Sequence, residues 1–423
     1  MKEDFLHYVW KHQKFPPSQL TTTTNEALRI VHPGRYNASD GPDFLEAQII
    51  IDGIKWVGSL EIHLKSSDWY QHSHQNDARY DNVILHVVWE DDIDVCRRDG
   101  TLVPTLVLSK YIAQNTIQQL RYFFSQKTSF IPCEEQLKQM PLPLFLLWKE
   151  RLYIERLETK SSDIQSLLKR TNNDWEGVLF ILLARNFGLN INGEAFGQIA
   201  KSIPFSVVRK IREARKDLEA LFLGQAGLVN SDTPTHYAKE LWERFSYLRH
   251  KFSLSQPEGV RLNFSGLRPP NFPTIRWVQL AALYANSAQL FSKFYSRNRI
   301  QTSWLKEIEV SPFWETHYTF SKSSAKRSKP LSERFIDLLK INTLIPFYFS
   351  FEKAMCNDPS EIIIDWIREI KGEENTITQG FVKIGGSNAT ALDSQAYIHL
   401  KKNYCNLKKC LLCAVGVHLL NQS

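Results

Sequence analysis

Asp43 and the segment Glu61-Ile62-His63-Leu64-Lys65 carry the side chains in this chain that are best suited to chemistry. Side chains alternate between the two faces of a strand, so Glu61, His63 and Lys65 share one face. Two carboxylates can hold Mg²⁺ or Mn²⁺, and basic neighbours can orient water or offset charge on a phosphate. The pattern predicts metal-dependent phosphodiester hydrolysis, with Asp43 and Glu61 as metal ligands and His63 and Lys65 as basic catalytic groups.

Two further histidines, His72 and His74, follow the predicted strand directly and could close over the site. Imidazoles bind metals and can hold a phosphate, so we predict that both histidines contact the substrate or the metal. The simpler interpretation is that Asp43 caps a turn after Pro42 and that the polar face of the strand is solvated. Polar residues on the open face of an antiparallel sheet need no function.

The elements that would position these residues occupy the first quarter of the chain. Alternating and apolar patterns predict a helix at 4–11 and strands at 27–32, 44–51, 54–65, 83–89 and 102–108. Asp52-Gly53 predicts a hairpin turn, which places Asp43 and Glu61 on adjacent strands. The run at 83–89 is almost continuously apolar, as in a central strand that is buried on both faces.

Helical patterns dominate after Tyr111, in segments that include 112–124, 142–159, 161–171, 175–187, 205–222, 274–296 and 394–421. We therefore predict an α+β protein. An N-terminal α/β sheet domain at 1–112 precedes a large all-α domain at 113–423, which is divided near 252–273.

The order of the N-terminal elements resembles the core of the PD-(D/E)xK nuclease superfamily, with Gly41-Pro42-Asp43 and Glu61-Ile62-His63 as the matching words. The resemblance implies a restriction-endonuclease-like sheet and a nucleic-acid substrate. The chain departs from the pattern at His63, where the superfamily usually has lysine. Lys65 lies on the same face but about 6.6 Å further along the strand. The alternative is a catalytically inactive protein that binds nucleic acid or another protein.

Nearly the whole chain is identified as a member of a family of bacterial proteins of unknown function, a resemblance that implies no activity. The matching words are Asn37-x3-Gly41-Pro42-Asp43-Phe44, Gly58-x2-Glu61-Ile62-His63, Ser67-Asp68-Trp69, the run at 83–88, the segments at 224–228 and 268–273, Ile341-Asn342-Thr343-x2-Pro346, and Tyr404-Cys405-x4-Cys410-x2-Cys413.

Charge is distributed unevenly along the chain, which carries +7 overall. Residues 1–112 hold 11 Lys and Arg against 16 Asp and Glu, and the remainder holds 41 against 29. Such asymmetry favours nucleic acid as a partner of the basic part, although solvated helix faces also accumulate Lys and Arg. Arg268, Asn271 and Arg276 surround a predicted helix start and could bind phosphate there. The alternative is a rigid turn between helices with Phe272 in the core.

Three of the six cysteines, Cys405, Cys410 and Cys413, have a spacing that metals use. His418 could complete a zinc site, or Cys356 an iron–sulfur site. We favour reduced thiols packed in a helix, because an apolar run surrounds Cys410 and Cys413 and the sequence offers no clear fourth ligand. Low cysteine content, no secretory signal and no membrane-spanning run predict a cytoplasmic protein.

Overall fold

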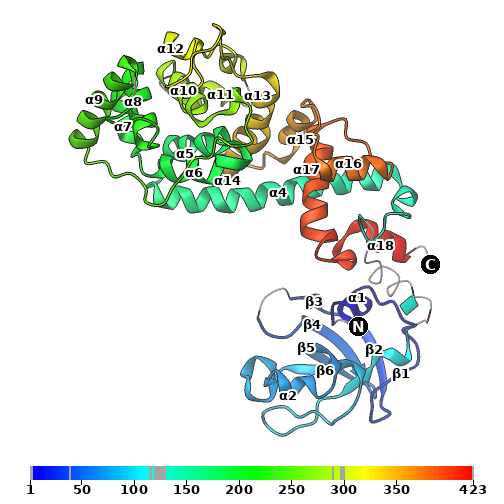
Figure 1. Ribbon diagram of the computed structural model, residues 1–423. Helices are drawn as coiled ribbons and strands as arrows, with labels where there is room; N and C mark the ends of the chain where they lie inside the picture. Colours follow the sequence, from blue (N-terminus) through cyan, green and yellow to red (C-terminus); the bar gives the residue numbers. More distant parts are fainter. Residues whose placement is uncertain are drawn as a thin grey trace. The chain divides into compact units, whose positions relative to one another are not determined.

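The computed structural model describes residues 3–37, 40–112, 114, 117–118, 130–233, 235–287, 290–295 and 301–421. The chain forms two compact units (Figure 1). The sheet unit comprises Met1–Leu146 together with Leu400–Ser423, and the helical unit comprises Leu147–His399. The sheet unit is therefore assembled from two separate stretches of chain. The domain boundary at 112 and the division near 252–273 stay predictions.

The sheet unit begins with α1 (Glu3–Lys11) and contains one seven-stranded sheet among its described residues. The strands are β1 (Leu20–Thr21), β2 (Ala27–His32), β3 (Arg35–Tyr36), β4 (Phe44–Ile51), β5 (Ile54–Lys65), β6 (Val83–Glu90) and β7 (Thr105–Val107). Short helices α2 (Asp68–Gln71), η1 (His74–Asn76) and η2 (Ala78–Tyr80) connect β5 to β6. The C-terminal stretch adds η8 (Leu400–Cys405), η9 (Cys410–Leu412) and α18 (Ala414–Asn421).

The sheet is mixed, and its strands follow the order β1-β2-β4-β5-β6-β7, with β3 beside β4. β4 is antiparallel to both β2 and β5, whereas β5, β6 and β7 are mutually parallel. β6 is buried over most of its length, as the apolar run predicts, because strands lie on both sides of it. β5 is exposed at its hairpin end and buried from Gly58 to His63, where the polar residues of the site lie.

Irregular backbone flanks the polar residues. The register of β4 against β5 shifts between Phe44 and Ala47, and Glu46 in the shift has a left-handed φ of 60°. Bulges of this kind bend a strand and redirect its side chains. On β5, a Cβ at Gly58 would lie 2.6 Å from the main-chain oxygen of Asn82. Only glycine permits this approach of β5 to the segment before β6.

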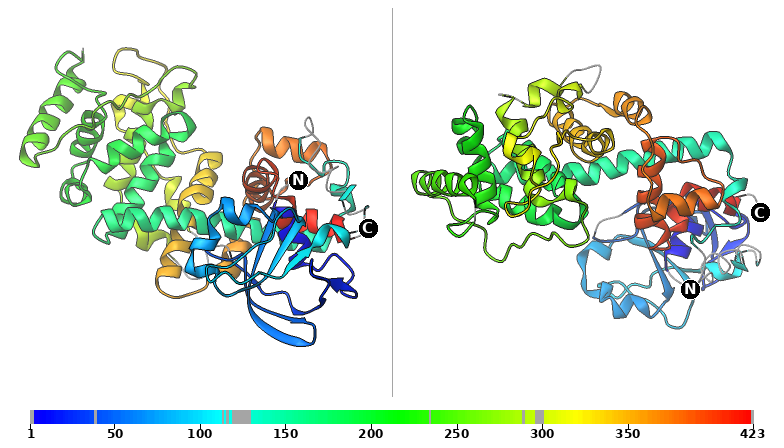
Figure 2. Two further views of the ribbon diagram at one scale, coloured as in Figure 1. Left: turned by 90° about the horizontal axis from the view of Figure 1, so that it is seen from below. Right: turned by 45° about the horizontal axis from the view of Figure 1, so that its top comes forward.

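The helical unit contains most of α4 (Leu142–Arg170), a long helix whose first residues belong to the sheet unit (Figures 1 and 2). Its other helices of seven or more residues are α5 (Trp175–Phe187), α6 (Leu189–Lys201), α7 (Phe205–Ile211), α8 (Arg215–Gln225), α9 (His236–Lys251), α10 (Pro273–Ala285), α13 (Glu333–Leu339), α14 (Ile345–Ala354), α15 (Ser360–Arg368), α16 (Thr376–Lys383) and α17 (Ala391–His399). The predicted α+β class, with an N-terminal sheet followed by a largely helical region, is confirmed.

Several predicted boundaries differ from the observed ones. The patterns at 142–159 and 161–171 form the single helix α4, whereas 205–222 splits at Arg212–Ala214 into α7 and α8. The predicted strand at 102–108 shortens to β7, and Leu108 begins the 3-10 turn η3 (Leu108–Lys110). The predicted helix at 112–124 lies mostly outside the described residues. Within those residues, none of the helices has the length and apolar character needed to span a bilayer.

Candidate functional site

Asp43 and Glu61 come together at the bulged end of the β4–β5 pair through reciprocal contacts. The Asp43 Oδ2 atom accepts a hydrogen bond of 3.0 Å from the main-chain N–H of Ile62. In return, Glu61 Oε2 accepts a hydrogen bond of 3.1 Å from the N–H of Asp43. The side chain of Glu61 is only 6% exposed and that of Asp43 is 22% exposed. The hairpin thus brings the two predicted metal ligands together, as the metal hypothesis requires.

Helix α1 adds two titratable residues that the sequence analysis did not include, Glu3 and His7. The His7 Nε2 atom lies 3.1 Å from Asp43 Oδ2. Burial lowers the pKa of His7, but hydrogen bonding and charge from Asp43 outweigh this and the net shift is upward. Burial also raises the pKa of Glu3. Because Glu3 and His7 are one turn apart, both lie on the same face of α1.

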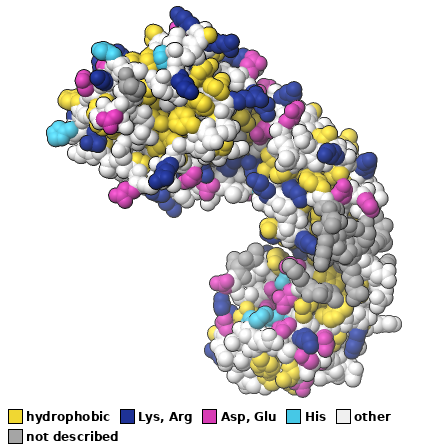
Figure 3. All heavy atoms as spheres, in the orientation of Figure 1, with side chains coloured by type: hydrophobic (Ala, Val, Ile, Leu, Met, Phe, Trp, Pro, Cys, Tyr) yellow, Lys and Arg dark blue, Asp and Glu magenta, His cyan; other side chains and the backbone are white. Residues whose placement is uncertain are grey.

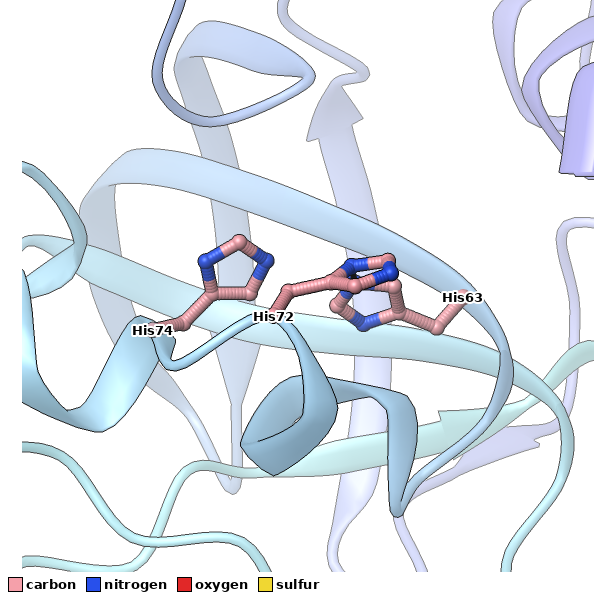
Figure 4. Close-up of side chains that lie close together, drawn as sticks. All are labelled: His63, His72 and His74. Carbon is pink, nitrogen blue, oxygen red and sulfur yellow. Dashed lines mark hydrogen bonds between the residues drawn. The ribbon is translucent and has the colours of Figure 1, made fainter.

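Histidines surround the other side of Glu61. Its Oε1 atom lies 3.2 Å from His74 Nε2 and 3.6 Å from His63 Nε2. The ligand atoms of His63, His72 and His74 all lie within 4.8 Å of one another. Figure 4 shows these three rings, with His63 on β5 and the other two on the segment around α2 and η1. Among the described residues, this trio is the one group of three or more such side chains whose ligand atoms lie close enough to share an ion.

A fourth histidine, His86 on β6, fixes the ring of His63. His63 Nδ1 and His86 Nε2 are 2.8 Å apart, while His63 Nε2 lies 3.2 Å from His72 Nδ1. His86 lies in the apolar run of β6. Its ring is fully buried, but its Nδ1 atom has no hydrogen-bond partner among the described residues. The bond from His86 leaves His63 Nε2 directed at Glu61 and His72.

Burial and mutual charge control protonation in this cluster. Burial, reinforced by the negative charge of Asp43, raises the pKa of Glu61 to about 9. Burial, with neighbouring histidines adding to it, lowers the pKa of His63 to about 2. Burial likewise lowers the pKa of His86 to about 3. The histidines nearest Glu61 are therefore neutral at pH 7, which is the form in which imidazole binds metals.

Lys65 has a different environment from the rest of its strand face. Its Nζ atom lies 3.7 Å from Glu90 Oε1, and both side chains are at least half exposed. The partner is its register neighbour on β6. Lys65 thus pairs with Glu90 at the exposed end of β5. Among the described residues, the contacts of Asp43, Glu61 and the histidines include no lysine at the position where the nuclease pattern expects one. A catalytic role for Lys65 stays a prediction.

Two of the three predicted phosphate-binding residues of the helical unit, Asn271 and Arg276, are hydrogen-bonded to each other. Arg276, at the start of α10, donates to Asn271 Oδ1 at 2.6 Å and to Gln279 Oε1 at 3.0 Å. Its guanidinium also lies 3.7 Å from the ring centroid of Phe335. Burial lowers the pKa of Arg276 to about 10. These contacts of Asn271 and Arg276 suit the alternative of a rigid turn between helices. Arg268 is exposed. Substrate binding by the three residues stays a prediction.

The site as a whole is a carboxylate–histidine cluster on one side of a mixed sheet. Figure 3 shows histidine and acidic side chains gathered on the visible face of the sheet unit. Carboxylate oxygens and imidazole nitrogens are ligands that divalent cations accept, and the ligand atoms of His63, His72 and His74 lie close enough to share one ion. Neutral imidazoles can also accept a hydrogen bond from a water molecule and so position it.

Fold and site together define an α+β protein with a polar, metal-compatible cluster in its sheet unit. The chain belongs to the family described as "Protein of unknown function (DUF2851)", which matches residues 3–376. This agrees with the resemblance of nearly the whole chain to a family of unknown function. No curated protein and no solved structure matches the chain.

Proposed function

We propose that the sheet unit is a metal-dependent phosphodiesterase that cleaves nucleic acid, as the PD-(D/E)xK nucleases do. The observation that carries the proposal is the convergence of Asp43 and Glu61 in buried surroundings. Burying a carboxylate costs free energy unless a cation or hydrogen bonds compensate for the lost hydration. Without a cation, burial and the charge of Asp43 raise the pKa of Glu61 to about 9, so the group holds a proton at pH 7. Because the imidazoles that contact Glu61 are neutral, a bound divalent cation is the group that would displace this proton and offset the charge of the carboxylate.

The roles follow from the contacts of each side chain. Asp43 and Glu61 would hold Mg²⁺ or Mn²⁺, and the cation would polarise the phosphate and lower the pKa of a bound water. His7 holds the carboxylate of Asp43 in place. His63 is kept neutral by burial and oriented by His86, so its Nε2 atom can accept a hydrogen bond from a water molecule and position that water.

The topology supports the same reaction class. Helix α1 precedes an antiparallel run of strands, Asp43 stands in front of β4, Glu61 lies on β5, and β6 follows in parallel. This is the order of elements on which the nuclease resemblance rests. The presence of His63 in place of a lysine leaves the water-orienting role to a neutral imidazole, as the pKa of His63 allows.

The test uses the full chain, freed of metal with a chelator and then supplied with Mn²⁺, Mg²⁺ or Zn²⁺. Labelled single- and double-stranded DNA and RNA serve as substrates. We expect cleavage with Mn²⁺ or Mg²⁺, and a loss of at least about 100-fold in Glu61→Gln, because the neutral amide cannot replace a carboxylate ligand. Glu46→Gln is the matched control, since Glu46 lies on β4 with its side chain 76% exposed.

Two results would overturn the proposal. One is equal activity in Glu61→Gln and the unmodified chain, which would trace cleavage to a contaminant. The other is nucleic-acid binding that weakens steeply with salt but is never followed by cleavage with any of the three metals. That outcome would favour an inactive binding protein, since salt dependence reports phosphate contacts alone.

A further inference from the structure

A second group of potential metal ligands lies in the sheet unit, apart from the carboxylate–histidine cluster. One small pocket is lined by Pro132, Cys133, Tyr404, Cys405, Cys410, Cys413 and Gly416. Four of the six cysteines of the chain therefore face one space. The fourth thiol, from Cys133, is the ligand that the sequence analysis could not identify. The exposed Cys356, considered for that place, belongs to the helical unit.

The backbone around the pocket brings distant segments together. Lys401 Nζ donates a 2.6 Å hydrogen bond to the main-chain oxygen of Phe130 and lies 4.8 Å from the Phe130 ring centroid. This contact joins the segment that contains Cys133 to the C-terminal stretch. At the far side, a Cβ on Gly416 would lie 2.1 Å from the oxygen of Cys410. Glycine there lets α18 begin directly against the turn that carries Cys410.

The local structure of the cysteines differs from the helix that we expected. Cys405 ends the π-helical segment η8, Cys410 opens the 3-10 turn η9, and Cys413 has extended backbone just before α18. None of these three lies in the interior of an α-helix. Short turns that present several thiols to one space are typical of metal-binding loops, whereas apolar packing requires neither the turns nor the sulfur atoms.

The thiols are enclosed and are not joined by disulfides. Cys133, Cys410 and Cys413 are buried, and all of them are free. Thiolates in this space would repel one another without a cation. A metal centre binds thiolates directly and so removes that cost.

The spread of the sulfur atoms distinguishes between two kinds of centre. A single zinc ion with Zn–S bonds of about 2.3 Å needs sulfurs about 3.8 Å apart. Among the described residues, the cysteines do not form a group whose ligand atoms lie close enough to share one ion. A four-iron cluster is larger, and its four thiolates stand around it at wider spacing.

From this geometry we infer that Cys133, Cys405, Cys410 and Cys413 bind an iron–sulfur cluster of the [4Fe–4S] type. The cluster would fasten the C-terminal stretch to the segment before α4. Because η9 contacts α1, it would also support the helix that carries Glu3 and His7. The inference does not depend on the proposed nuclease activity.

The test is to purify the full chain without oxygen or chelators and to measure iron, acid-labile sulfide, zinc and visible absorption. We expect about four iron atoms and four sulfides per chain. Cys133→Ser should reduce both to less than about half. Cys356→Ser is the matched control and should retain them, because this exposed thiol belongs to the other unit.

A second measurement, on the unmodified chain, distinguishes the loss of a cluster ligand from loss of iron through misfolding of the variant. Protein depleted of iron should regain the visible absorption and the iron when equal amounts of ferrous and ferric iron are supplied with sulfide in the absence of oxygen. One equivalent of zinc without sulfide would overturn the inference. So would a metal-free protein that fails to take up iron and sulfide on reconstitution.

Discussion

Glu61 shares its buried surroundings with the carboxylate of Asp43, so its protonation is linked to folding. Its pKa is about 9 in the folded protein, against an ordinary value of 4.5. The folded chain retains a proton that the unfolded chain releases over that interval. Its contribution to stability is therefore fully present below pH 4.5 and is lost as the pH rises toward 9.

The upward shift of the Glu61 pKa predicts a pH dependence of stability for the metal-free protein. The free energy of unfolding should fall between about pH 5 and pH 9, and Glu61→Gln should remove a large part of that slope because the amide does not titrate. Urea unfolding across the range, with Glu46→Gln as the control, measures the effect. Parallel slopes for Glu61→Gln and the unmodified chain would show that Glu61 is ionised in the folded protein.

His86 acts on the site through His63, which makes it a positioning residue. Replacing His86 by Phe removes the 2.8 Å contact with His63 Nδ1. His63 belongs to the histidine trio whose ligand atoms can share an ion, and loss of a bond that supports a ligating histidine typically costs 10–100-fold in metal affinity. We expect a decrease of about that size in Mn²⁺ affinity, measured by calorimetry.

The matched variant is His86→Gln, whose amide can still bond to the His63 ring. It should retain more of the Mn²⁺ affinity than His86→Phe does. Equal losses in both variants, with unchanged far-ultraviolet circular dichroism, would assign His86 to core packing rather than to orientation of His63.

At the scale of the elements, the paired strands β5 and β6 set the spacing of the site. A methyl group on Gly58 would lie 2.5 Å from Ile84 Cγ2 and 2.6 Å from Asn82 O. Overpacking of this kind typically costs about 1–3 kcal/mol. We predict that Gly58→Ala lowers the free energy of unfolding by that amount and weakens metal binding as β5 shifts.

The control is Gly197→Ala on helix α6. Its added methyl would meet side-chain atoms of Arg185 at 3.6 Å and beyond, which is ordinary contact distance. Alanine is the better helix former by up to about 1 kcal/mol, so this variant should be neutral or more stable. If Gly58→Ala also proves neutral, the backbone there is free to move and glycine is not required.

The alternation of side chains along a strand accounts for the part of the site that could be predicted from the sequence. A period of two put Glu61 and His63 on one face, and a two-residue turn put Asp43 beside them. Lys65 obeys the same period, yet it reaches the exposed end of β5 and pairs with Glu90. Periodicity identifies a face of a strand but not where along that strand burial ends.

Residues supplied by distant elements could not be predicted in this way. His7 comes from a helix and Cys133 from a segment about 270 residues before Cys405. Their contacts depend on how elements pack, and one sequence contains no signal for that packing. The break between α7 and α8 at Arg212–Ala214 could not be predicted either, because an apolar helical pattern continues across it.

At the scale of the whole molecule, the helical unit is joined by a buried ion pair between the two ends of its sequence. Lys149 on α4 bonds to Asp393 on α17, and both residues are at most 6% exposed. Removing one partner of a buried pair leaves an uncompensated charge, which costs about 3–5 kcal/mol. We predict a loss of that size in Asp393→Ala, measured by chemical unfolding.

The comparison variant is Lys65→Ala, which removes the exposed pair with Glu90. Exposed pairs contribute about 0–1 kcal/mol, so this change should be small. A loss below about 1 kcal/mol in Asp393→Ala would mean that water reaches Lys149 and that the helical unit tolerates separation of α4 from α17.

The division of the sheet unit between two stretches of chain has a consequence for its synthesis. Residues 400–423 emerge from the ribosome only after the whole helical unit has been translated. At about 5–20 residues per second, the roughly 250 intervening residues take roughly 10 to 50 seconds. During that interval the sheet unit lacks its C-terminal stretch of η8, η9 and α18, so the helical unit can fold before the sheet unit is complete.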